Sequence, residues 1–250
     1  MTIIERPVRM PRLAFLAIWD HGELGDPPAV VEETPRYVTD DFTAKLRKQS
    51  LRLLAQFGLA AGDSPTPRLR GTLRLLAGAR REVYAWSDFG RHRGDNGAIL
   101  VSAAGREAVR LTTDERTVQL EPVSPKDIAA SLVDALPGCD AARIRPLQVS
   151  KAYYDAASPD PLAESSAAAD QLRHLMRAER DALHQMHAAR RDSDGERVHS
   201  TALSAIDLTG RGRVLSFVND DDDGAPQINL YSGTRTHLVD ALTLTLGGLV

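Results

Sequence analysis

The feature of this sequence that most constrains its fold is an internal repeat. The segment GREAVRL begins at Gly105, and the segment GRVLSFV begins at Gly212. Each is followed by a turn, another extended segment and a helix that contains the identical pentapeptide LVDAL, at 132–136 and 238–242. Because a repeated order of elements indicates repeated structural units, we expect two similar units. The shared order carries more weight than the pentapeptide, since the chain is rich in Ala and Leu.

Segments around the first copy have the two-residue period of β-strands. REVYAWSD and GAILVSA are separated by the glycine-rich FGRHRGDNG, and REAVRLTTDERTVQLEPV indicates a strand pair that turns near Asp114 and Glu115. This pattern predicts an antiparallel meander of about four strands. Upstream of it, LLAGARREVYAW corresponds to LMRAERDALHQM in the second half. We therefore predict an α+β protein with a pseudo-twofold antiparallel sheet and helices packed beside it.

Helical spacing appears between the extended segments. TDDFTAKLRKQSLRLLAQFGLAAGD predicts a helix that ends at Gly58, and PRLRGTLRLLAG predicts a second one. A further helix is expected to open at Ser124 and Pro125. The segment 170–191 allows two interpretations: one long helix, or a helix that ends near Ala178 and a strand from Leu183. The repeat favours the helix followed by a strand.

Composition limits the function classes. With 250 residues and 42% hydrophobic residues, the chain can form a substantial core. Its net charge of -3 provides no global basic field for nucleic acid or an anionic membrane. Cys139 is the only cysteine, which fits a reducing compartment. The apolar run LAFLAI near the N-terminus is too short to span a membrane, so we expect a cytosolic protein without a signal peptide or membrane anchor.

The run of four aspartates in VLSFVNDDDDGAPQINLY could belong to a calcium loop or to a turn. Asn219, Asp221, Asp223 and Gly224 match the first, third, fifth and sixth positions of an EF-hand loop, but Leu230 replaces the bidentate carboxylate. The flanks resemble strands, whereas an EF-hand requires helices. The pattern therefore favours a hairpin turn in which Gly224 supplies a positive φ.

Catalytic patterns are incomplete. GDS at 62–64 with Asp181 and His184 suggests a serine hydrolase that uses Ser64, but this serine follows a helix in a turn-like loop. A zinc cluster of His174, His184 and His187 lacks a recognised metal-binding spacing. We expect no catalytic residue, no cofactor and no metal, and the balance of evidence favours a binding function over an enzyme.

Several segments together resemble the EspG family of ESX (type VII) secretion-associated chaperones of actinobacteria. The segments that carry the resemblance are LAFLAIWDHGELGDPPAVVE, LRLLAQFGLAAGD, GAILVSAAGREAVRL, VSPKDIAASLVDALP, and the tail from IDLTGRGRVLSFV to the second LVDAL. Together they extend over nearly the whole chain from about Leu13.

The resemblance implies a single domain over residues 1–250, with pseudo-repeats at approximately 13–150 and 151–250, in which a central antiparallel sheet is flanked by two helical bundles. It also implies a cytosolic chaperone for PE and PPE protein pairs, which covers the apolar tip of the PPE helical hairpin and delivers the pair for export. Two alternatives are a GDS-type serine hydrolase and a diverged scaffold with another protein partner.

No invariant partner motif is recognisable in the sequence. Arginine and aromatic residues are common at protein interfaces, so we place the partner-binding surface on a hairpin loop and on one helix face. The residues of this predicted surface are Phe89, Arg91, His92 and Arg93 in the loop and Arg173, Arg177 and Arg180 on the helix. The alternative is that these residues are a solvated turn and an exposed helix face.

Overall fold

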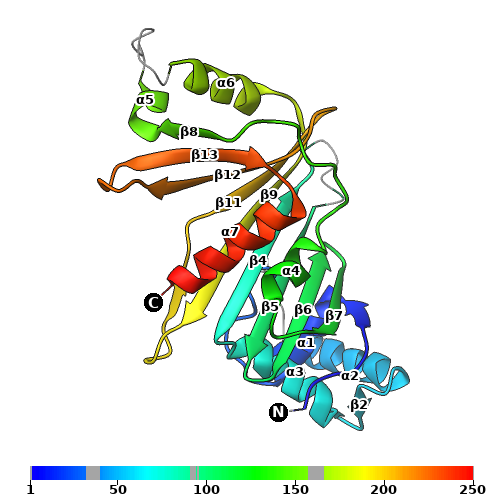
Figure 1. The fold of residues 1–250 in the computed structure, drawn as a ribbon. Helices are drawn as coiled ribbons and strands as arrows, with labels where there is room; N and C mark the ends of the chain where they lie inside the picture. Colours follow the sequence, from blue (N-terminus) through cyan, green and yellow to red (C-terminus); the bar gives the residue numbers. More distant parts are fainter. Residues whose placement is uncertain (1, 32–39, 91–93, 95, 157–165, 250) are drawn as a thin grey trace.

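A computed structural model describes residues 2–31, 40–90, 94, 96–156 and 166–249 (Figure 1). Within these residues, eleven strands form one antiparallel sheet, and two very short strands form a second one. The strands of the large sheet, in spatial order, are β1 (Val8–Pro11), β7 (Thr117–Val123), β6 (Glu107–Asp114), β5 (Gly97–Ala104), β4 (Arg81–Asp88), β9 (Arg180–Arg191), β11 (Leu203–Leu208), β12 (Gly212–Asp220), β13 (Pro226–Ser232) and β8 (Leu147–Ser150), while β10 (Arg197–His199) also pairs with β9. The short pair is β2 (Ala60–Ala61) with β3 (Ser64–Pro65).

The order of the strands in the large sheet is symmetric about its centre. β4 and β9 pair there, from Arg81 opposite Arg190 to Asp88 opposite Leu183. Strands from the first half of the chain follow β4 on one side, and strands from the second half follow β9 on the other. This order is consistent with a two-unit repeat. β8, which ends just before residue 151, pairs with β13 at the outer edge of the second half of the sheet.

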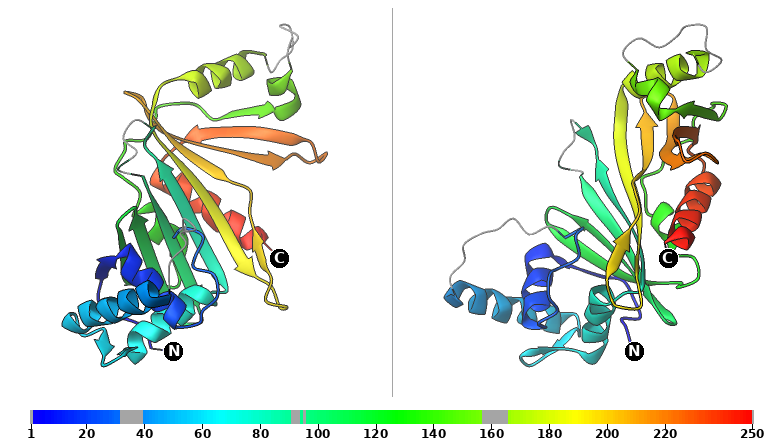
Figure 2. Two further views of the ribbon diagram at one scale, coloured as in Figure 1. Left: turned by 180° about the vertical axis from the view of Figure 1, so that it is seen from behind. Right: turned by 90° about the vertical axis from the view of Figure 1, so that its left-hand side faces the viewer.

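Helices cover both faces of the sheet (Figure 2). Their bounds are α1 (Arg12–His21), α2 (Asp40–Gln56), α3 (Pro67–Ala77), α4 (Ile128–Val133), α5 (Lys151–Asp155), α6 (Ser166–Arg177) and α7 (Arg235–Gly248). Helices α4 and α7 lie on one side, and α1 and α2 lie on the other side. Successive residues of a strand face opposite sides. Val83 and Ala85 accordingly pack with α4 and α7, whereas Tyr84 packs with α1 and α3.

The repeated pentapeptide forms the centre of one core. Leu132 in α4 and Leu238 and Leu242 in α7 are 0–1% exposed, and Leu136 just beyond α4 is also buried. All four belong to one cluster with the inner residues of β4, β5, β9 and β11. A second cluster joins α1, α2 and α3 to the first half of the sheet, and a third joins α6 to the second half.

The predicted fold class is confirmed by the antiparallel sheet with its meander, and by the helices on its two faces, α4 and α7 on one and α1 and α2 on the other. The interpretation of 170–191 as a helix and a strand is also confirmed, because α6 ends at Arg177 and β9 begins at Arg180. The acidic run is a hairpin turn between β12 and β13, in which Asp221 accepts hydrogen bonds from the backbone of Asp223 and Ala225. The predicted start of the helix at Pro125 is wrong, since α4 begins at Ile128.

No helix in the described ranges has the length and apolar character needed to cross a membrane.

Candidate partner-binding groove

A groove of about 1640 Å³ lies on the face of the sheet opposite α4 and α7. Its apolar lining comes from α1, α2, the segment after α1, and strands β4, β5 and β9. The apolar side chains are Leu13, Leu16, Ala17, Trp19, Pro27, Val30, Phe42, Leu46, Trp86, Ala98 and Leu183. The groove therefore joins residues from distant parts of the chain on one surface.

Helix α1 has a buried side and a side that faces the groove. Phe15 and Ile18 are completely buried, and Trp19 is 2% exposed. The indole Nε1 of Trp19 donates a hydrogen bond to the backbone oxygen of Gly25 at 2.8 Å, which holds the segment after the helix in place. Leu13, on the other side of α1, is 57% exposed. A large exposed apolar side chain beside an apolar groove is typical of an interaction surface.

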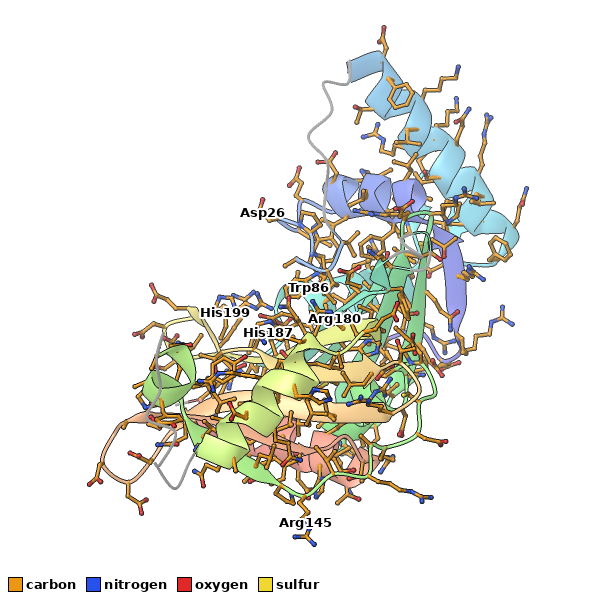
Figure 3. All side chains as sticks on the ribbon, turned by 90° about the horizontal axis from the view of Figure 1, so that it is seen from above. Asp26, Trp86, Arg145, Arg180, His187 and His199 are labelled. Carbon is orange, nitrogen blue, oxygen red and sulfur yellow. The ribbon has the colours of Figure 1, made fainter. Side chains whose placement is uncertain are left out.

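Aromatic rings gather where the groove meets the centre of the sheet. We call Tyr84, Trp86, His187 and His199 the aromatic patch. Figure 3 labels Trp86, His187 and His199. The rings of Tyr84 and His187 stack with centroids 5.1 Å apart, and Trp86 contacts both of them edge-on. His199 Nδ1 lies 3.4 Å from the Tyr84 hydroxyl. Trp86 also lines the groove, so the patch adjoins the groove at this residue.

Charged side chains hold the patch in position. The guanidinium of Arg197 lies over the Tyr84 ring, 5.2 Å from its centroid, and donates a hydrogen bond to Glu82 at 2.7 Å. Burial, the largest effect, raises the pKa of Tyr84, while Arg197 opposes this shift. The Tyr84 hydroxyl therefore stays protonated at neutral pH and can donate a hydrogen bond.

The groove also has an acidic rim. Five carboxylates line it against two guanidinium groups. These charged residues are Asp20, Asp26, Asp88, Asp114 and Glu115, with Arg12 and Arg116. Although burial would raise the pKa of Asp114, hydrogen bonds from the backbone of Arg116 and Thr117 outweigh it and lower that pKa. Asp114 therefore stays ionised at neutral pH.

The predicted loop site lies only partly within the described residues. Arg91, His92 and Arg93 lie outside the described residues. Phe89 is half-buried, and its ring contacts His184 with centroids 5.9 Å apart. The residues at the base of the loop, Asp88 and Asn96, line the groove. A segment bound in the groove would thus lie next to the base of this loop.

The three arginines predicted to share a helix face do not do so. Arg173 lies in α6, where it pairs with Asp170 at 3.0 Å and donates hydrogen bonds to the backbone oxygens of Tyr153 and Tyr154. Its side chain therefore joins α5 to α6. Arg177 is exposed in the last turn of α6, and Arg180 is exposed in β9, so the prediction of a common helix face is wrong.

A buried polar network was not predicted from the sequence. Arg213 donates hydrogen bonds from Nε and Nη2 to the two carboxylate oxygens of Asp207, at 2.6 and 2.8 Å. His184 Nε2 lies 3.3 Å from Asp207 Oδ2, and His184 Nδ1 lies 2.7 Å from Ser87 Oγ. Burial alone would raise the pKa of Asp207, but the hydrogen bonds from Arg213 and His184 hold it well below its usual range. The segment IDLTGRGR could have indicated this pair. It contains an Asp and an Arg on either side of a glycine-containing turn, and Asp207 and Arg213 are opposite each other on β11 and β12.

In this network His184 already has other partners, which does not fit the alternative hydrolase site. Ser64 is exposed in β3, whereas both ring nitrogens of His184 contact other residues. The carboxylate of Asp181 accepts a hydrogen bond from Thr209 at 2.7 Å. Ser87, His184 and Asp207 are the residue types of a catalytic triad, but His184 is completely buried and Arg213 occupies both oxygens of Asp207. The arrangement therefore serves to join β4, β9, β11 and β12.

The three histidines considered for zinc have separate partners. His174 Nε2 lies 3.3 Å from Arg211, and His187 belongs to the aromatic patch. In the part of the chain that the structure describes, no group of three or more His, Cys, Asp or Glu side chains could hold a metal ion.

Comparison with known proteins identifies the family. No curated protein matches this sequence. A solved structure, described as the Mycobacterium tuberculosis type VII secretion system chaperone EspG5 in complex with a PE25–PPE41 dimer, matches with a TM-score of 0.70 at 14% identity, over 98% of this chain and 97% of that chain. The two chains therefore share a fold. The model of the EspG family matches residues 11–243, and this chain belongs to the EspG family.

Proposed function

We propose that this protein is a cytosolic type VII secretion chaperone. It binds a PE and PPE protein pair, covers the apolar tip of the PPE helical hairpin, keeps the pair soluble and delivers it for export. Membership in the EspG family and the shared fold with EspG5, which was solved with a PE25–PPE41 dimer, support this proposal.

The observation that carries the proposal is the apolar groove. An exposed apolar tip promotes aggregation, and a chaperone must offer an apolar surface of matching size. The groove provides such a surface on two helices and a sheet face, with exposed Leu13 at its edge and Trp86 at its floor. Its volume exceeds the roughly 300–1,000 Å³ of most small-molecule pockets, which favours a polypeptide segment as the occupant.

The loop site and the arginines are part of this proposal. Phe89, Arg91, His92 and Arg93 would contact the bound pair beside the groove, and Arg180 would do so from β9. Arg177 would contribute from the end of α6. Arg173 would act indirectly, because its hydrogen bonds to Tyr153 and Tyr154 hold α5 against α6.

Co-expression tests this function. The chain is expressed with PE and PPE proteins encoded near its gene, and the mixture is analysed by pull-down and size-exclusion chromatography. A soluble ternary complex is expected, with PPE solubility that depends on this chain. Soluble PPE without the chain, or no complex with any candidate pair, would refute the proposal.

A matched pair of variants links binding to the groove. Leu13→Asp places a charge at the edge of the groove and should weaken complex formation. Leu244→Asp changes an even more exposed leucine, on α7 at the opposite face, and should leave it unchanged. If both variants bind the pair like wild type, the groove is not the binding surface.

A further inference from the structure

We infer that the groove selects a helical partner segment that carries basic residues beside its apolar ones. This inference rests on the proposed function, and it specifies which partners the chain accepts. Its basis is the combination of an apolar lining and an acidic rim in a single groove. Shape and apolar character determine that a polypeptide segment binds, and the charges determine which segments are preferred.

The carboxylates of the rim are mostly available to a partner. Within the described residues, only Asp114 among the five forms an ion pair, with Arg9 at 3.8 Å. Asp20, Asp26 and Glu115 are exposed. Asp88 is also exposed and accepts hydrogen bonds from the Gly90 backbone and from Asn96, which leave its charge in place. A partner with Lys or Arg at the rim would therefore be able to pair with these exposed carboxylates.

The position of the charges explains the preference for an amphipathic helix. Asp20 is near the end of α1, Asp26 follows α1, and Asp88 ends β4, whereas the apolar side chains of Leu16, Leu46 and Trp86 lie in the same groove. A helix can place apolar residues on one stripe and basic residues beside it, because residues three and four apart share a face. An acidic helix of the same shape would be repelled by the rim.

Synthetic peptides test the charge preference directly. Two amphipathic peptides of about 15 residues are compared, one built from Leu and Lys and the other from Leu and Glu, so that only the charge differs. The chain contains two tryptophans, Trp19 and Trp86, and both line the groove, so intrinsic fluorescence reports its occupancy. At low salt, the Leu/Lys peptide should bind at least about tenfold more tightly than the Leu/Glu peptide.

Two double variants with the same change in net charge locate the effect. Asp20→Lys with Asp26→Lys reverses part of the rim and should reduce the preference to within about threefold. Asp222→Lys with Asp223→Lys reverses two exposed carboxylates of the β12–β13 turn, outside the groove, and should retain the full preference. Equal binding of both peptides to wild type, or an equal loss of preference in the two variants, would overturn the inference.

The same variants separate this inference from the proposed function. If a PE and PPE pair binds the rim variant as tightly as wild type, the charge preference is wrong while the chaperone function stands. If the peptides show the predicted preference but no PE and PPE pair binds, the groove selects basic helices and the chaperone function is wrong.

Discussion

At the residue scale, the buried pair of Asp207 and Arg213 has the largest consequences. The side chains are 9% and 6% exposed, and Arg213 also donates a hydrogen bond to the backbone oxygen of Pro137 at 2.9 Å. Its backbone accepts hydrogen bonds from Ala142 and Gly233. Arg213 thus connects β12 to the segment that follows α4, and a buried ion pair tolerates the removal of one partner poorly.

Removing one partner should therefore destabilise the protein strongly. Asp207→Ala leaves a buried guanidinium without its carboxylate and should lower the free energy of unfolding by about 3–5 kcal/mol. Asp134→Ala breaks the exposed pair with Arg235, whose side chains are 49% and 60% exposed, and should cost less than about 1 kcal/mol. Urea unfolding measures both. Similar losses in the two variants would contradict the structural role of Asp207.

The same carboxylate predicts a response to acid. The pKa of Asp207 is lower in the folded protein than in the unfolded chain, so the ionised carboxylate stabilises the folded state. This contribution is complete above the unfolded-state pKa of about 3.9 and is lost as the pH falls toward the lower folded-state pKa. Between pH 5 and pH 3, wild type should lose more unfolding free energy than Asp207→Asn does. Parallel pH profiles of the two proteins would show that Asp207 does not contribute this dependence.

The two glycines at the start of the repeated segments should differ in their tolerance of a side chain. Gly105 has a φ of +60°, and a Cβ there would meet nothing within 4 Å. Gly212 has a φ of +91°, and a Cβ there would lie 2.5 Å from the backbone oxygen of Asp140. Gly105→Ala should therefore cost about 1 kcal/mol, and Gly212→Ala should cost at least about 1 kcal/mol more. Thermal and urea unfolding measure the loss of unfolding free energy in each variant. Equal losses would mean that the backbone at Asp140 moves away from the new Cβ without an energetic cost.

At the element scale, the pentapeptide LVDAL has the same role in two unequal helices. Helix α4 (Ile128–Val133) contains only Leu132 and Val133 of its copy, whereas α7 (Arg235–Gly248) contains the whole second copy. The leucines of both copies nevertheless lie in one core. The repeat predicted these contacts, because apolar residues at helical spacing identify the buried face. Ser124 and Pro125 did not mark the start of α4, because local capping signals are weaker than packing onto the sheet.

Equivalent leucines should therefore contribute comparably to stability. Leu132→Ala and Leu238→Ala should each lower the unfolding free energy by about 2–5 kcal/mol, since both side chains are almost completely buried. Leu244→Ala, with a side chain 76% exposed on α7, should change it by less than about 0.5 kcal/mol. If Leu238→Ala resembled Leu244→Ala in chemical unfolding, α7 would not pack as described.

At the scale of the whole molecule, the sequence predicts the sheet better than the groove. Period-two patterns and the repeat are local signals, and they identified the meander and the strand β9. The groove combines Leu13, Phe42, Trp86 and Leu183, which come together only through tertiary packing. The three arginines were predicted to share one helix face, although Arg180 lies in β9. The pairing of Ser87 with His184 is equally non-local, since 97 positions separate them.

We propose that the groove of this EspG-family chain holds the tip of a PE and PPE pair. Amide hydrogen exchange of the chain, measured alone and with a co-purified pair, tests this most directly because it maps protected backbone along the sequence. We predict slower exchange in α1, in the first turns of α2 and at the base of the β4–β5 hairpin, with no change in α7. Protection of α7 and α4 without protection of α1 and the hairpin would show that the pair binds the opposite face of the sheet.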